Sequence, residues 1–385
     1  MTERAGVSRP EWSRPGVSRR GVFAGAAGLV ALAGAPGAGR AAPAPAPALF
    51  GPPPGVAQLS RNENPYGPSP AALRAIAETA ALGCWYANAA TERLAAMIAE
   101  RNGLAPDHVM VGAGSSEVLD CATMAFGRSG AIVAPELLFD PPLAYAEGKG
   151  VEVRRVPLAP DMGIDLDALA AAARAPGVAL VHLCNPNNPT GLAIPGATLA
   201  AFIDRLPGHV TVLVDEAYNE LTPDPPAFSV VGRVRAGDRV IVTRTFSKLH
   251  GLAGLRVGYA LGRPDLLERL RPWSMSVGGN TAGLAAAVAS LDDAPFLAMS
   301  RARIVEGREM IAAAAAAQGL PTLPSAANFV LVRVPDAERL RAALAAEKIL
   351  VRGPYGRFRE WSRVSCGRLE DIRRYAEALP RALAA

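Results

Sequence analysis

The sequence has few of the residues that build disulfide-rich domains or structural metal sites. Its four cysteines are far apart in the chain, with no Cys-x-x-Cys pair and no histidine-rich cluster. This spacing argues against a disulfide scaffold and against a structural zinc site, and we expect no metal. Aromatic residues make up only 5% of the chain although 50% of its 385 residues are hydrophobic, an ordinary balance for a globular protein rich in alanine. No internal repeat is evident.

The chain also has little net charge once its N-terminus is set aside. The formal net charge is +5, but residues 1–42 hold six arginines and two glutamates and so account for +4 of it. The remaining charge of about +1 is too small to indicate binding to nucleic acid or to a membrane surface. We therefore expect small-molecule partners and no nucleic acid.

Residues 1–42 have the pattern of an export signal. Ser18-Arg19-Arg20-Gly21-Val22-Phe23 precedes a glycine- and alanine-rich apolar run that is too short to span a bilayer stably. The paired arginines resemble the twin-arginine signal, which carries folded proteins. We expect residues 1–42 to be a signal peptide, residues 43–57 to be an Ala/Pro linker, and the protein to be periplasmic or extracellular. The alternative is an N-terminal extension that happens to be rich in arginine and alanine, in a cytoplasmic protein.

Short apolar runs alternate with helical patterns from about Val109 to Gly262. This alternation is typical of an α/β domain in which helices cover both faces of a parallel sheet. Beyond Gly262 helices and strands are mixed, which predicts a smaller α+β domain. We expect an N-terminal arm over residues 58–80, a large domain over residues 81–275 and a C-terminal small domain over residues 276–385.

Three successive apolar runs in the large domain each end in residues that can carry chemistry. The first run is followed by a loop with Asn188, the second by Asp215 and Tyr218, and the third by a loop with Lys248 and Arg256. Because parallel strands bind ligands at their carboxyl ends, we expect these residues to meet at one edge of the sheet. Taken singly, Asp215 could cap a helix and Tyr218 could pack in the core, but three convergent strand ends favour a ligand site.

The loop with Lys248 has the composition of a pyridoxal phosphate site. A lysine in a mostly buried loop loses hydration, so the pKa of its amine falls, and this suits a nucleophile that forms a Schiff base. Thr245, Ser247 and the fork of Arg256 suit a phosphate group. The alternative is an ordinary surface loop without a ligand site, whose lysine faces solvent.

A second anion site is predicted where a short strand ends in Gly112-Ala113-Gly114 and a helix begins with Ser115 and Ser116. Free backbone N–H groups at the start of a helix point outward and bind anions. Such glycine turns are often only structural, so this segment alone leaves both readings open.

Together these segments resemble the fold-type I pyridoxal phosphate-dependent aminotransferases of class I/II, and most closely the histidinol-phosphate aminotransferase subgroup. The resemblance covers about Ser60 to the C-terminus. It implies an aspartate aminotransferase-like fold with a mostly parallel seven-stranded sheet and a smaller C-terminal domain. The matching segments are Asn62-Glu63-Asn64-Pro65, Asn188-Pro189-Thr190-Gly191, Asp215-Glu216-Ala217-Tyr218, Thr245-Phe246-Ser247-Lys248 with Arg256, Ala327-Asn328-Phe329, and Arg363-Val364-Ser365.

The resemblance also implies roles for the cofactor site. Lys248 would form the Schiff base with pyridoxal 5'-phosphate and move the proton in the 1,3-shift, while Asp215 would pair with the protonated pyridine nitrogen. Asn188 and Tyr218 would hydrogen-bond the phenolic oxygen, and Phe139 would stack on the ring. The residues implied to hold the phosphate are Ser115, Ser116, Thr245, Ser247 and Arg256. Tyr86 resembles a residue that reaches the cofactor phosphate of the neighbouring subunit, which implies a homodimer.

On the substrate side, the resemblance makes Arg363 the clamp for the α-carboxylate, assisted by Asn328. Arg352 stands where the subgroup often binds a distal anion of the substrate. We also place Asn64 and Tyr66 in the substrate pocket. The arginines of the segment 352–359 would suit an anionic substrate tail, although a solvated basic loop fits them equally well.

We therefore expect an aminotransferase that moves an amino group between an L-amino acid, or an amino alcohol phosphate, and a 2-oxo acid by a ping-pong mechanism. A lyase, cyclase or oxidase would use the same cofactor residues and stays open as an alternative. A non-enzymatic ligand-binding protein is the least favoured alternative, because the lysine, aspartate and arginine that this chemistry needs are all present.

Overall fold

The computed structural model describes residues 48–276 and 278–385. The predicted signal peptide and the first part of the predicted linker lie outside the described residues. All elements named below belong to the compact unit of residues 50–385.

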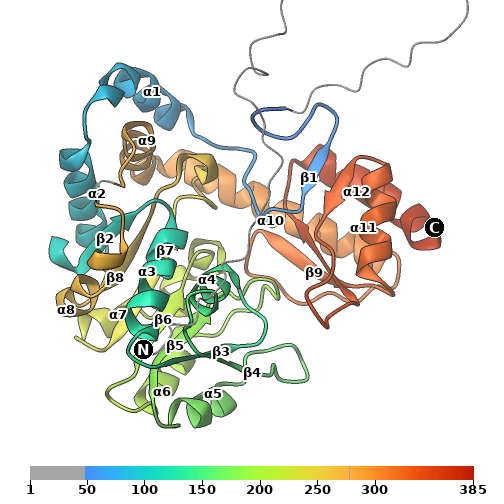
Figure 1. Ribbon diagram of the computed structural model, residues 1–385. Helices are drawn as coiled ribbons and strands as arrows, with labels where there is room; N and C mark the ends of the chain where they lie inside the picture. Colours follow the sequence, from blue (N-terminus) through green and yellow to red (C-terminus); the bar gives the residue numbers. More distant parts are fainter. Residues whose placement is uncertain (1–47, 277) are drawn as a thin grey trace, which may run out of the picture. The chain divides into compact units, whose positions relative to one another are not determined.

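Seven strands form a mostly parallel sheet in the order β2-β8-β7-β6-β5-β3-β4 (Figure 1). Only β8 runs antiparallel to its neighbours, β2 and β7, within this sheet. The predicted seven-stranded, mostly parallel sheet is therefore confirmed, with one antiparallel strand near its edge. The strands are β2 (Val109–Gly112), β3 (Ala131–Pro135), β4 (Val153–Val156), β5 (Val178–Cys184), β6 (Thr211–Asp215), β7 (Val240–Thr245) and β8 (Gly258–Gly262).

Helices cover both faces of this sheet. On β5, Val181 and Leu183 belong to one cluster of buried side chains, whereas Leu180 and Cys184 belong to another, as the alternation of side chains along a strand requires. The first cluster also takes side chains from α2 (Asn88–Arg101), α5 (Leu166–Ala173), α6 (Gly196–Asp204), α7 (Val231–Arg235) and α9 (Thr281–Leu291). The second takes them from α3 (Ser115–Gly127), α4 (Pro141–Glu147) and α8 (Pro264–Glu268).

The C-terminal part has its own small sheets and its own core. β9 (Phe329–Arg333) pairs antiparallel with β11 (Trp361–Ser365), and β10 (Ile349–Val351) pairs parallel with β1 (Ala57–Leu59). The helices α10 (Ala294–Ala316), α11 (Ala337–Ala346) and α12 (Leu369–Ala384) pack around these strands in a third cluster of buried side chains. This arrangement confirms the predicted smaller α+β part.

The N-terminal segment links the two parts. Figure 1 shows β1 beside the C-terminal elements, whereas the following helix, α1 (Pro70–Thr79), packs on α9. The chain between β1 and α1 runs past β11, because the backbone N–H of Asn62 donates to Ser365 Oγ at 2.9 Å. Residues that are 303 positions apart in the sequence are thereby in contact.

No single helix among the described residues is long and apolar enough to cross a membrane. The helices α9 and α10 satisfy both conditions only as a pair, and the pair is bent by 90°.

Candidate active site

A cavity lies at the carboxyl ends of β5, β6 and β7. Asn188 follows β5, Asp215 ends β6 and Lys248 follows β7, and all three line one space of about 270 Å³. A second space of about 940 Å³ adjoins the first, because Asn188, Tyr218 and Lys248 line both. The structure thus brings the predicted strand ends together. The other predicted cofactor residues in the walls of the first space are Ser115, Ser116, Phe139, Tyr218, Thr245, Ser247 and Arg256.

Lys248 points into this cavity. Its Nζ atom donates a hydrogen bond to the backbone oxygen of Asn62 at 3.0 Å and lies 5.5 Å from the centre of the Tyr218 ring. Burial lowers the pKa of the Lys248 amine to about 8, and the nearby Arg363 guanidinium acts in the same direction. Near neutral pH a part of the molecules therefore carries the neutral amine, which is the nucleophilic form.

Asp215 has one carboxylate oxygen engaged and one nearly free. Oδ1 accepts hydrogen bonds from the Thr243 hydroxyl at 3.1 Å and from the backbone N–H of Ala217 at 3.2 Å. Among the described residues, the only donor near Oδ2 is the weak Cys184 thiol at 3.8 Å. Burial raises the pKa of Asp215 to about 6, so the group is still anionic at neutral pH. Such a buried carboxylate suits a cationic ring nitrogen.

Tyr218 is buried and takes part in both the core and the site. Its ring packs edge-on against Phe329, with 5.3 Å between the ring centres. Its hydroxyl oxygen accepts hydrogen bonds from Asn62 Nδ2 at 3.1 Å and from Asn188 Nδ2 at 3.4 Å. Burial raises the pKa of the phenol, so that it stays protonated.

The opposite end of the first space is built for a phosphate group. At its N-terminus α3 has no side-chain cap, so its first N–H groups are free to bind an anion, with Ser115 as the first helical residue. A side chain at Gly114 would collide with the Arg256 guanidinium, and its φ of +81° also favours glycine. Thr245 Oγ1 and Ser247 Oγ lie 2.9 Å apart, and Arg256 Nη1 lies 3.4 Å from Ser247 Oγ. Within the described residues Arg256 has no carboxylate partner.

Arg363 lies on β11 in the wall of the larger space. It donates from Nη1 to Asn188 Oδ1 at 2.7 Å and from Nη2 to the backbone oxygen of Ser60 at 2.9 Å. Its buried Nε and the buried Oδ1 of Asn328 have no hydrogen-bond partner within the described part of the chain. Arg363 therefore has donor capacity left for a further ligand.

The three arginines of the segment 352–359 have different surroundings. Arg357 forms a two-fold ion pair with Glu136, with 2.6 Å from Nη2 to Oε1 and 3.1 Å from Nε to Oε2. Arg359 lies 3.9 Å from an Asp336 oxygen and does not line the larger space. Arg352 lines it, lies 5.5 Å from the Tyr355 ring centre, and has no acidic partner among the described residues. One arginine of this segment is thus left for an anionic ligand.

Four predicted site residues do not line either space: Asn64, Tyr66, Tyr86 and Asn328. Asn328 donates from Nδ2 to the backbone oxygen of Asn62 at 2.9 Å, beside the cavity. The amide of Asn64 donates to the backbone oxygens of Lys248 and Leu249 and to Ser300, and the Tyr66 hydroxyl accepts from the backbone N–H of Leu369. Both side chains therefore fasten the N-terminal segment. Tyr86 is 82% exposed in the single chain and away from the cavity.

Comparison with known proteins decides the family. The family model "Aminotransferase class I and II" matches residues 54–379. The chain belongs to this family.

Among curated relatives, this aminotransferase is 38% identical over 337 residues to histidinol-phosphate aminotransferase 1 of Cupriavidus pinatubonensis. The alignment covers 86% of this chain and 89% of the relative. It is 40% identical over 311 residues to the aromatic amino acid aminotransferase of Nocardia farcinica. That alignment covers 79% of this chain and 86% of the relative. Among solved structures, that of histidinol-phosphate aminotransferase from Sinorhizobium meliloti in complex with pyridoxal-5'-phosphate superposes with a TM-score of 0.79 at 31% identity, over 85% of this chain and 90% of the other.

Several residues that line the larger space of this aminotransferase had no predicted role of their own, among them Asn62, Glu136 and Tyr355. Asn62 stands in the same motif as Asn64, and nothing local shows which of the two faces the cavity. Its φ of +55° is a conformation that asparagine adopts more readily than most residues. Glu136 meets Arg357 across 221 positions of sequence, which leaves no local signal.

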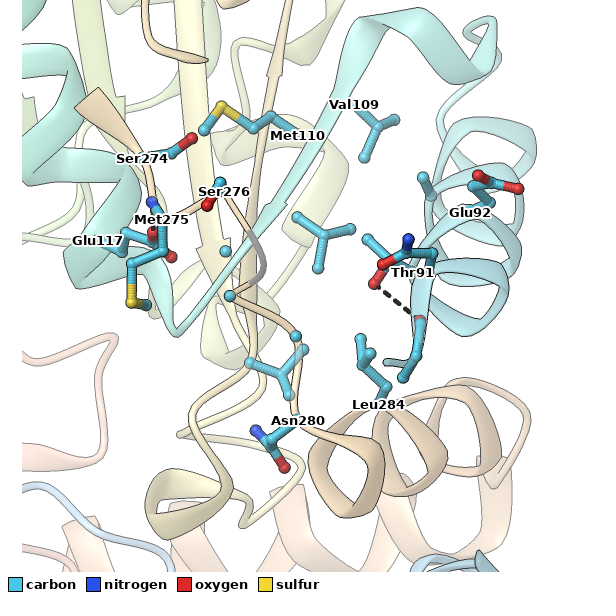
Figure 2. A pocket seen from close by; sticks show the side chains of 18 of the residues that line it. Thr91, Glu92, Val109, Met110, Glu117, Ser274, Met275, Ser276, Asn280 and Leu284 are labelled. Atoms are coloured by element: carbon cyan, nitrogen blue, oxygen red, sulfur yellow. Dashed lines mark hydrogen bonds between the residues drawn. The ribbon is translucent and has the colours of Figure 1, made fainter. Parts of the chain in front are cut away.

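A separate cavity of about 660 Å³ is shown in Figure 2. Of the predicted site residues, only Arg256 lines it. Glu117, on one of its walls, accepts hydrogen bonds from the backbone N–H groups of Ala113 at 2.6 Å and Met275 at 2.8 Å. Thr91 and Leu284 lie on the other side of this cavity in Figure 2. We assign it no part in the chemistry of the site.

Proposed function

We propose that this aminotransferase uses pyridoxal 5'-phosphate to transfer an amino group between an L-amino acid, or an amino alcohol phosphate, and a 2-oxo acid by a ping-pong mechanism. The observation that carries the proposal is that a lysine of lowered pKa, a buried carboxylate and a phosphate cradle line one cavity, with Arg363 in its adjoining space.

The residues present fit this cofactor. Asp215 Oδ2, which lacks a strong donor, would face the ring nitrogen, and Asn188 and Tyr218 would face the phenolic oxygen. Phe139 lines both spaces and can stack on the ring. The phosphate would be held by Ser115, Ser116, Thr245, Ser247 and Arg256. When bound, pyridoxal 5'-phosphate supplies an electron sink that makes the α-proton of the substrate acidic.

The chain's own residues then supply binding and proton transfer. The Arg363 fork binds the substrate carboxylate, which fixes the α-carbon beside Lys248. The Lys248 amine, with a pKa of about 8, accepts and returns the α-proton. Asp215 stays anionic at neutral pH, since its pKa is about 6, and stabilises a positive ring nitrogen.

For the substrate side chain, we propose one distal anion at Arg352. Support comes from the lack of an acidic partner for Arg352 among the described residues, whereas Arg357 is neutralised by Glu136. The apolar side chains of Leu137, Leu138 and Phe358 line the same space and would contact the part of the substrate between its α-carbon and this anion. The similarity to a histidinol-phosphate aminotransferase agrees with a distal anion, and the similarity to an aromatic amino acid aminotransferase agrees only with the apolar part of this space.

We further propose a homodimer. Support comes from the exposed side chains of Trp85 and Tyr86, at 73% and 82%, and of Trp273 and Met275, at 44% and 57%, because aromatic residues and methionine are enriched in protein interfaces. Tyr86 would then approach the cofactor site of the second copy. Analytical ultracentrifugation should give twice the chain mass, and a monomer at micromolar concentration would contradict this.

Export through a twin-arginine signal is also a proposal, supported only by the sequence of residues 1–42. N-terminal sequencing of periplasmic material should begin between residues 42 and 49. An intact chain confined to the cytoplasm would contradict it.

The amino transfer itself is tested by single-turnover mixing of the pyridoxal 5'-phosphate-loaded protein with a panel of L-amino acids and amino alcohol phosphates. We expect conversion of the cofactor to pyridoxamine phosphate with release of one equivalent of oxo product. Release of ammonia with unchanged cofactor, or oxygen uptake, would instead support the lyase or oxidase alternative.

A further inference from the structure

We propose that Asn62 is a positioning residue that makes the Tyr218 hydroxyl a hydrogen-bond donor toward the cofactor and holds the amine of Lys248. The proposal rests on the aminotransferase function proposed above. Asn62 opens one of the motifs that match the family, but neither the sequence nor the resemblance gave it a role of its own. Two groups next to this site, the Asn62 backbone N–H and the Arg363 guanidinium, can only donate, and they set the direction of the other hydrogen bonds.

The orientation of the Asn62 amide is fixed by its own backbone. The Asn62 N–H, which can only donate, points to Ser365 Oγ at 2.9 Å. The Ser365 hydroxyl proton is therefore free to go elsewhere, and Asn62 Oδ1 accepts it at 2.7 Å. With Oδ1 turned to Ser365, Nδ2 faces the Tyr218 oxygen at 3.1 Å and donates to it.

The second neighbour of the Tyr218 hydroxyl is oriented in the same way. The Arg363 guanidinium, which also can only donate, points to Asn188 Oδ1 at 2.7 Å. Asn188 Nδ2 then faces the Tyr218 oxygen at 3.4 Å. Both lone pairs of the Tyr218 hydroxyl thus receive amide protons, and its own proton cannot point to either amide. Because Tyr218 lines the cofactor space, this proton is directed into it.

The backbone of Asn62 contacts the second reactive group of the site, the amine of Lys248. At a φ of +55° the chain is left-handed at Asn62, and its carbonyl oxygen accepts from Lys248 Nζ at 3.0 Å and from Asn328 Nδ2 at 2.9 Å. One residue therefore touches both the lysine and the tyrosine of the site. Asn64, two residues on, is buried as well, but its amide binds two backbone oxygens and Ser300 and does not contact Tyr218.

The test is the pH dependence of the visible absorption band of the pyridoxal 5'-phosphate-loaded protein. A proton donated by Tyr218 to the phenolic oxygen stabilises the more negative form of the bound cofactor, so it lowers the pH at which the band changes. Asn62→Gly keeps the left-handed backbone and the carbonyl but removes the amide. We expect it to raise this midpoint by about half a unit to one unit, the worth of one hydrogen bond.

Three further variants separate a positioning role from a general loss of stability. In a Tyr218→Phe background, Asn62→Gly should shift the midpoint by less than about a quarter of a unit, because the group through which it acts is gone. Asn185→Ala is the matched control, because Asn185 is a buried asparagine whose amide binds the backbone oxygens of Ile194 and Phe228 away from the cavity. It should lower the melting temperature and leave the midpoint in place. Ser365→Ala, which frees the Asn62 amide to turn over, should shift the midpoint upward and supplies the test if Asn62→Gly does not fold.

An unchanged midpoint in folded, cofactor-loaded Asn62→Gly, or an equal shift with and without the Tyr218 hydroxyl, would overturn the proposal. A wild-type protein that shows no visible band at all would contradict the proposed function, and this proposal with it. The two failures are distinguishable because the wild-type spectrum is recorded first.

Discussion

The two sides of the active-site cavity are built in different ways. The cofactor side is built mainly at the ends of three adjacent strands of one sheet, where Asp215, Tyr218 and Ser247 are buried and follow closely on their strands in the sequence. The substrate side joins the segments around Ser60, Glu136 and Arg352, which lie far apart in sequence, and Arg357 there is 68% exposed. A rigid sheet edge thus fixes the cofactor chemistry, while specificity depends on distant segments packing together.

Removal of Lys248 should have the largest effect, because it removes the nucleophile on the cofactor side. We expect Lys248→Ala to lose the visible absorption band of covalently bound cofactor and to lower amino transfer by about 10⁴-fold or more. Lys149→Ala is the matched control, since Lys149 is exposed. Spectra and single-turnover rates check both variants, and substantial transfer by Lys248→Ala would contradict the assigned role.

Arg363 should have the next largest effect, and it should act on every substrate. Arg363→Ala removes the partner of the α-carboxylate, so substrate binding should weaken by about 2–5 kcal/mol. By contrast, Arg352→Ala should weaken by about 1.5–3 kcal/mol only those substrates that carry a distal anion. Substrate affinities measured for alanine and for an anionic amino acid separate the two, and an equal loss for both substrates in Arg352→Ala would refute the division of roles.

The lowered pKa of Lys248 predicts how cofactor capture depends on pH. Only the neutral amine attacks the cofactor aldehyde, so the capture rate should rise with pH up to a midpoint near 8 instead of the usual 10.5 for lysine. Below this midpoint the rate should fall by about tenfold per pH unit. Stopped-flow absorbance with apo-protein measures it, and a rate that still climbs steeply above pH 9.5 would show that the cavity does not lower the pKa.

Loss of the ion pair between Glu136 and Arg357 should have the smallest effect on substrate affinity. It is mostly exposed on the arginine side, and such pairs contribute about 0.2–1 kcal/mol. We expect Arg357→Ala to change substrate affinity by less than about fivefold. A loss as large as that of Arg352→Ala would mean that the pair, and not Arg352 alone, defines the substrate side.

The same division explains what the sequence could predict. The sheet, its two-faced burial and the meeting of Asn188, Asp215 and Lys248 follow from local patterns, since every parallel strand ends at the same edge. The antiparallel course of β8 has no local signal. The choice between Asn62 and Asn64 depends on the left-handed turn at Asn62 and on Ser365, and the surroundings of Arg357 depend on Glu136. These contacts form only when distant segments pack.

The most direct measurement is reduction of the pyridoxal 5'-phosphate-loaded protein with borohydride, followed by mass spectrometry of its peptides. The chain has only three lysines, Lys149, Lys248 and Lys348, and Lys149 and Lys348 are exposed. We expect one cofactor per chain, fixed on the peptide that contains Lys248. Label on an exposed lysine alone, or no label on Lys248 in a folded protein, would contradict it.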